Sequence, residues 1–63
     1  MNTRQLLVYL NSEYDGLIKK ASMYFNKWIE TGEDVYKENE LLHTGSAHAI
    51  LRIMEILTIK EGE

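Results

Sequence analysis

Apolar residues recur every three or four positions through the first half of the chain. With the two gaps alternating, they fall at Leu7, Leu10, Tyr14, Leu17, Ala21, Tyr24 and Trp28. This spacing matches one face of an α-helix, whereas a half-buried strand requires a period of two. Asn2 and Gln5 have the spacing of an N-terminal capping box, so the pattern predicts a helix over residues 3–31. Gly16 costs about 1 kcal/mol relative to alanine, but the pattern keeps its phase across it, which favours one continuous helix.

A polar segment at residues 31–34 interrupts the pattern. Gly32 suits the left-handed conformation that ends many helices, and Thr31 or Asp34 can cap the helix that follows. Beyond it, two neighbouring and mostly apolar stripes follow helical spacing. The first comprises Val35, Asn39, Leu42, Ser46, Ala49, Ile53 and Ile56, and the second comprises Tyr36, His43, Ala47, Ile50, Met54 and Leu57. The pattern predicts a second helix over residues 34–60.

Two long helices joined by a tight turn predict an all-α antiparallel hairpin, with all 63 residues in a single domain. Pairing around the turn places side by side residues whose numbers sum to about 64. One seam between two helices buries too little surface to offset about 1.5 kcal/mol of conformational entropy per residue. We therefore expect two hairpins to pack as a twofold four-helix bundle. The residues expected to make this self-association are Ile18, Phe25, Ile50, Ile53, Met54 and Leu57.

Composition narrows the classes of function. The chain of 7.4 kDa has no cysteine, which excludes thiol chemistry and disulfide staples. It has no apolar run of the roughly 18–20 residues that a membrane span needs, and no signal-like start, so we expect a cytoplasmic protein that does not insert in membranes. A net charge of −3 argues against nucleic-acid binding. The only basic group is Lys19, Lys20 and Lys27; a dimer would double it, which keeps a nucleic-acid-associated regulator as the alternative function.

Three polar patterns in the sequence are candidates for chemistry. Glu40 and His43 have the spacing of a ligand pair in di-iron bundles, but the register places Ala21 and Tyr24 opposite them instead of further carboxylates. Ser46 lies between His43 and His48, yet no group is indicated that would orient an imidazole or stabilise an oxyanion. The Thr44-Gly45-Ser46 step lacks the spacing and lysine of a phosphate loop. We expect no catalytic, metal or cofactor site, and no enzyme activity.

The first helix is rich in tyrosine and lysine, the turn is acidic, and the second helix carries Gly-Ser-Ala-His-Ala before Ile-Leu-Arg-Ile-Met-Glu-Ile-Leu. Over its whole length the chain resembles small helical-hairpin proteins of phages and prophages of low-GC Gram-positive bacteria. The resemblance implies an accessory or host-directed binding protein and transfers no functional residue. These features predict a non-enzymatic protein-interaction module, an adaptor or inhibitor, that acts as a homodimer and binds a protein partner. The candidate partner contacts are the outward-facing Tyr9, Leu41 and Leu51.

Overall fold

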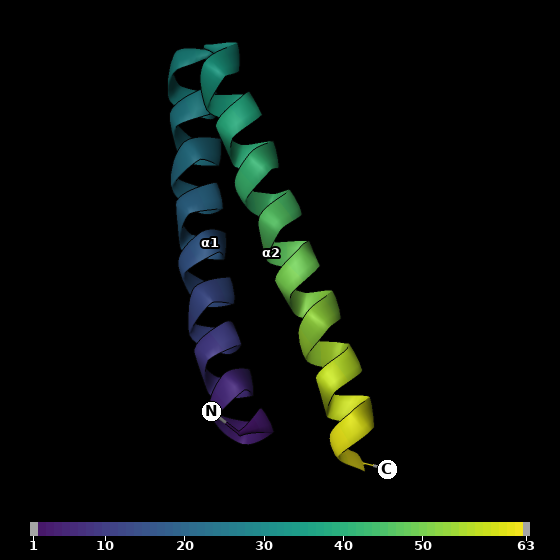
Figure 1. The fold of residues 1–63 in the computed structure, drawn as a ribbon. Helices are drawn as coiled ribbons and strands as arrows, with labels where there is room; N and C mark the ends of the chain where they lie inside the picture. The colour runs from purple at the N-terminus through teal and green to yellow at the C-terminus, as the bar shows by residue number, and fades with distance from the viewer. Residues whose placement is uncertain (1, 63) are drawn as a thin grey trace.

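The computed structural model describes residues 2–62, with side chains for residues 2–60. Two helices, α1 (Thr3–Thr31) and α2 (Asp34–Gly62), pack against each other and contain nearly all of the described residues, none of which forms a strand. They run in opposite directions, so that both chain ends lie at the same end of the hairpin (Figure 1). The predicted all-α hairpin is confirmed, and the second helix extends two residues beyond the predicted boundary.

The start of α1 is fixed by the predicted capping box. The Asn2 side chain accepts a hydrogen bond of 2.8 Å from the Gln5 backbone N–H, and the Gln5 side chain accepts one of 3.1 Å from the Asn2 N–H. These two bonds satisfy amide groups that the first turn of a helix leaves without partners. Gly16 lies within the unbroken helix, where an added Cβ would meet nothing within 4 Å. The predicted continuity of this helix is therefore confirmed.

The turn between the helices uses the conformational freedom of Gly32. Its φ of 70° and ψ of 7° lie in the left-handed region, and its N–H donates to the Trp28 carbonyl at 2.7 Å. The Thr31 hydroxyl donates to the Lys27 carbonyl at 2.8 Å and accepts from the Glu33 N–H at 3.2 Å. Gly32 thus ends α1 as predicted, while Thr31 bridges the end of α1 to the residue before α2.

The line of contact between the helices, here called the seam, follows the predicted α1 stripe and the second of the two α2 stripes. Along it, Ala21 and Ala47 are buried, and the larger side chains are half-buried. The Tyr24 ring lies 6.5 Å from the Tyr36 ring and 5.2 Å from the His43 ring. The residue numbers sum to 60 for Tyr24 and Tyr36 and to 67 for Tyr24 and His43, and the predicted sum of about 64 lies between these values.

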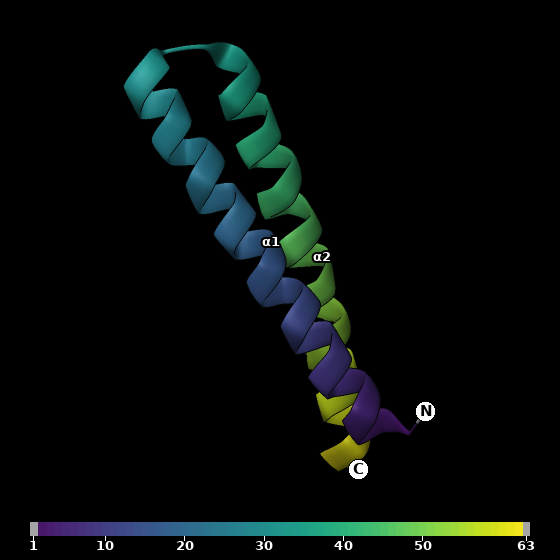
Figure 2. The same cartoon turned by 90° about the vertical axis from the view of Figure 1, so that its left-hand side faces the viewer.

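The hairpin is a long rod in which Ala21 and Ala47 are the buried apolar residues among those described. Its extents are 47 × 14 × 13 Å, and its radius of gyration of 14.5 Å exceeds the value of about 11 Å expected for a compact chain of this length. The helices overlap near the turn in Figure 1 and near the chain ends in Figure 2, so the plane of the pair rotates along the rod. No large side chain among the described residues is fully buried. Packing of one helix on the other therefore leaves much apolar surface in water.

Candidate interaction surface

The seam divides the rod into two faces. Because a helix turns by about 100° per residue, side chains one position after the seam residues lie on one side and those one position before lie on the other. Phe25 and Lys37 each follow a seam residue, and the Lys37 ammonium lies 5.6 Å from the centre of the Phe25 ring. Lys27 precedes a seam residue and lies 5.9 Å from the centre of the Tyr36 ring. We call the side that carries Phe25 and Lys37 the Phe25 face, and the side that carries Lys27 the stripe face.

The stripe face carries a mostly apolar line on α2, interrupted by Asn39 and Ser46. This α2 stripe is the first of the two predicted stripes, and its largest members are strongly exposed: Val35 53%, Leu42 67%, Ile53 47% and Ile56 54%. One set of its residues, Val35, Leu42, Ala49 and Ile56, repeats every seven positions, and a second set, Asn39, Ser46 and Ile53, falls between them. This is the spacing of a coiled-coil contact line. The helix α2 therefore has two such lines, and the hairpin covers only one.

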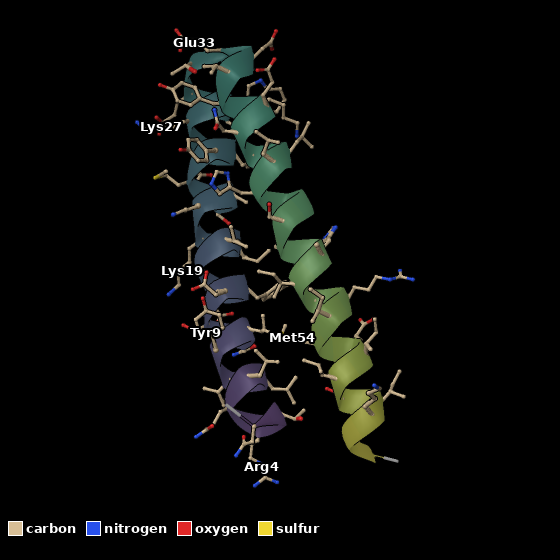
Figure 3. The ribbon with its side chains drawn as sticks, viewed as in Figure 1. Arg4, Tyr9, Lys19, Lys27, Glu33 and Met54 are labelled. Atoms are coloured by element: carbon tan, nitrogen blue, oxygen red, sulfur yellow. The ribbon has the colours of Figure 1, made fainter. Side chains whose placement is uncertain are left out.

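The α1 side of the stripe face carries both charged and apolar side chains. Its members precede the α1 seam residues and are Leu6, Tyr9, Glu13, Gly16, Lys20, Met23 and Lys27. The three lysines of the predicted basic group do not share a side of α1. Lys20 and Lys27 lie on the stripe face, whereas Lys19 lies directly opposite the seam and projects from α1 away from α2 (Figure 3).

The Phe25 face contains a hollow of about 370 Å³. Its lining residues are Ile18, Ala21, Ser22, Phe25, Asn26, Glu40 and Thr44. The Glu40 side chain is only 16% exposed, with Oε1 3.8 Å from Lys37 Nζ and Oε2 buried without a hydrogen-bond partner. Lys37 in turn lies 5.0 Å from the centre of the Trp28 ring. Glu40 is thus an acidic residue within the seam, compensated by a lysine that packs on aromatic rings.

The Glu40 and His43 pair does not lead to a ligand cluster. His43 Nδ1 lies 2.7 Å from the Asn39 carbonyl, so this ring nitrogen donates to the backbone, and the ring packs on Tyr24. Ala21 borders the hollow beside Glu40, as the register predicts. Within residues 2–60, no group of three or more histidine, aspartate or glutamate side chains could hold a metal ion. The side chains of this region accordingly serve the contact between the helices.

The structure distributes the six predicted self-association residues over three places. Ile50, Met54 and Leu57 are half-buried in the seam, and Met54 lies between the helices in Figure 3. Ile53 is exposed on the stripe face, whereas the half-buried Ile18 and the exposed Phe25 lie on the opposite face. The exposed members of the set therefore do not form one patch.

The three predicted partner contacts are also separated. Tyr9 is 54% exposed on α1, and Leu41 is 56% exposed on the outer side of α2. Leu51 lies on the Phe25 face beside a second hollow, of about 460 Å³, whose other lining residues are Met54, Glu55, Thr58 and Ile59. The predicted site residues do not include Val35, Leu42, Ala49 and Ile56, which the sequence places on one helical stripe and the structure leaves exposed.

Comparisons with protein-family models, curated proteins and solved structures found no match for this chain. Neither described helix has an apolar stretch long enough to cross a lipid bilayer. The surface features of the hairpin are therefore the basis on which a function can be inferred.

Proposed function

We propose that this chain is a small non-enzymatic protein-interaction module that acts as a homo-oligomeric helical bundle, with two hairpins packed as four helices. The observation that carries this proposal is the α2 stripe, which has coiled-coil spacing but no helix against it in the single hairpin. Contiguous apolar surfaces of this kind on small proteins mark interaction sites.

The size of the exposed surface supports association with another chain. The hairpin exposes 4862 Å², and a stable interface of standard size takes about 800 Å² from each partner, which is roughly a sixth of that surface. The α2 stripe runs most of the length of a 29-residue helix. A second hairpin laid along it would give the bundle the apolar core that one hairpin lacks.

A bundle of this kind would leave further apolar side chains free to bind a protein partner, as an adaptor or inhibitor does. Leu41 and Leu51 lie outside the α2 stripe and would stay exposed, whereas Tyr9 lies on the stripe face and would be covered by the second copy. Single exposed apolar side chains are common on protein surfaces and do not by themselves indicate a partner. They can still supply contacts when a partner binds. Self-association is therefore the step to test first.

The test is the solution mass of the protein by light scattering over micromolar concentrations, with circular dichroism on the same samples. We expect high helicity and a mass of twice 7.4 kDa. We also expect helicity to fall on dilution as the mass falls, because stability that depends on association follows mass action. A mass of 7.4 kDa at all concentrations, with full helicity, would show that the hairpin is stable alone and would overturn the proposal.

A further inference from the structure

We propose that the two copies meet through their stripe faces, with α2 antiparallel to α2 of the second copy and the twofold axis passing between Ser46 and Ala49. This inference rests on the proposed self-association and specifies its surface, direction and register. The occupant of the α2 stripe is thus a second copy of this chain.

The angle between the two contact lines of α2 supports this arrangement. Each stripe residue directly precedes a seam residue, as Leu42 precedes His43 and Ile53 precedes Met54. The two lines therefore lie about 100° apart around the helix. A helix at the corner of a four-helix bundle contacts two neighbours at roughly a right angle, so α2 can pack on α1 with one line and on a second α2 with the other.

Side-chain size sets the register along the stripe. Ser46 and Ala49 are small and exposed at its middle, while Leu42 and Ile53 lie on either side of them. With the axis between Ser46 and Ala49, antiparallel helices place Leu42 of one copy beside Ile53 of the other, because the numbers of facing residues sum to about 95. The backbones approach most closely where the side chains are smallest, and the larger side chains interlock at both ends.

Charges on α1 fit the same axis. At the level of the axis, α1 faces α1 of the second copy near residue 17, as the hairpin register requires. Glu13 and Lys20 both lie on the stripe face, four and three residues from that point, so each Glu13 faces Lys20 of the other copy. A parallel arrangement would instead place Lys20 against Lys20 and Lys27 against Lys27. Opposite charges therefore favour the antiparallel direction.

Cysteine cross-linking tests this arrangement without background, because the chain has no cysteine of its own. Ala49→Cys lies close to the twofold axis, offset by about 5 Å along the helix from its copy, and we expect a disulfide-linked dimer on mild oxidation. Ile56→Cys lies about 25 Å from its copy and serves as the matched control, which should stay unlinked. Leu42→Cys and Ile53→Cys should each stay unlinked alone but form a mixed dimer when combined.

The outcomes separate this inference from the proposed function. Linking of Ile56→Cys as fast as Ala49→Cys would show parallel helices and overturn the antiparallel direction. A dimeric mass without linking of Ala49→Cys, or of the Leu42→Cys and Ile53→Cys mixture, would overturn the stripe face while leaving self-association intact. A monomeric mass for the unmodified chain would overturn both.

Charge reversal gives an independent test. We expect Glu13→Lys and Lys20→Glu each to weaken dimerisation by about fivefold to tenfold, since two exposed ion pairs become repulsive, and we expect the double variant to recover most of the loss. Asp15→Lys makes the same change at nearly the same level of α1 but on the Phe25 face, and it should have less than a twofold effect. Equal effects of Glu13→Lys and Asp15→Lys, or no recovery in the double variant, would overturn the proposed pairing.

Discussion

The two helices have equal length but unequal apolar surfaces. On α1, apolar residues concentrate in the seam, and those beside it are interrupted by polar residues such as Asn11, Asp15 and Ser22. On α2, a second apolar line runs beside the seam and stays exposed. The exposed apolar residues of α1 are therefore divided between its two sides, whereas most of those of α2 lie along one line. This difference makes α2 the element through which the hairpin would associate.

The largest effect is expected from charges placed on the α2 stripe. In Ile53→Glu with Ile56→Glu, association would bury carboxylates in an apolar interface, which costs several kcal/mol for each charge. We expect the mass to fall from a dimer to 7.4 kDa and the helicity to fall with it. Light scattering and circular dichroism measure both effects.

The matched control places the same charges on α1. Val8 and Ile29 are 69% and 63% exposed, at least as much as the two stripe residues, and both lie on the Phe25 face. Val8→Glu with Ile29→Glu should leave the dimeric mass unchanged. Equal dissociation of both double variants would contradict the claim that α2, and not α1, is the element through which the hairpin associates.

Smaller effects are expected from substitutions that distinguish the two lines of α2, one in the seam and one in the stripe. Ala47 is fully buried in the seam, so Ala47→Leu overpacks the contact with α1 and should lower the free energy of unfolding by about 1–3 kcal/mol. Ala49 is exposed in the single hairpin, so Ala49→Leu would be nearly neutral there. We expect Ala49→Leu to weaken association. Urea unfolding at two protein concentrations distinguishes this weaker association from the lower stability of the hairpin expected for Ala47→Leu. A neutral Ala49→Leu at both concentrations would contradict an interface on the stripe.

The turn provides a test of the hairpin itself. Gly32→Ala places a Cβ on a residue with φ of 70°, which costs about 1–2 kcal/mol, although no neighbouring atom lies within 4 Å of that Cβ. We expect a lower midpoint of thermal unfolding with the same native mass, because the turn lies at the end of the rod and away from the middle of the α2 stripe. A change of mass at temperatures where the protein is folded would instead show that the turn takes part in the association.

The smallest effect is expected at the start of α1. Asn2→Ala removes the hydrogen bond that the Gln5 backbone N–H donates to the Asn2 side chain and should lower the free energy of unfolding by about 1 kcal/mol. Amide hydrogen exchange should increase in the first turn of α1 and stay unchanged near the turn between the helices. Uniformly faster exchange along both helices would show that the ends of the rod are more tightly coupled than the packing indicates.

Local signals made most of the fold predictable. The capping box at Asn2, the glycine at the turn and the uninterrupted apolar spacing of α1 each act over a few residues, and each is found in the structure. The ends of both helices followed from them to within two residues. The register followed as well, because a two-residue turn leaves little freedom in how antiparallel helices align.

The division of α2 into a covered and an exposed line was not predictable in the same way. Both stripes are apolar with helical spacing, so the pattern alone does not decide which one faces α1. Contacts between distant residues decide it. Tyr36 and His43 pack on Tyr24, and Glu40 lies within the seam beside Lys37, which packs on Phe25 and Trp28. Glu40 could not be recognised as a seam residue, because an acidic side chain gives no apolar signal.

The most direct test of the central claim measures whether the α2 stripe is covered in solution. Thiol-labelling rates of Ile53→Cys and Val8→Cys report the accessibility of the stripe and of the opposite face, which are 47% and 69% exposed in the single hairpin. We predict that Ile53→Cys reacts at least tenfold more slowly than Val8→Cys at high protein concentration and approaches its rate on dilution. Similar rates for the two thiols at every concentration would contradict the claim that a second copy covers this stripe.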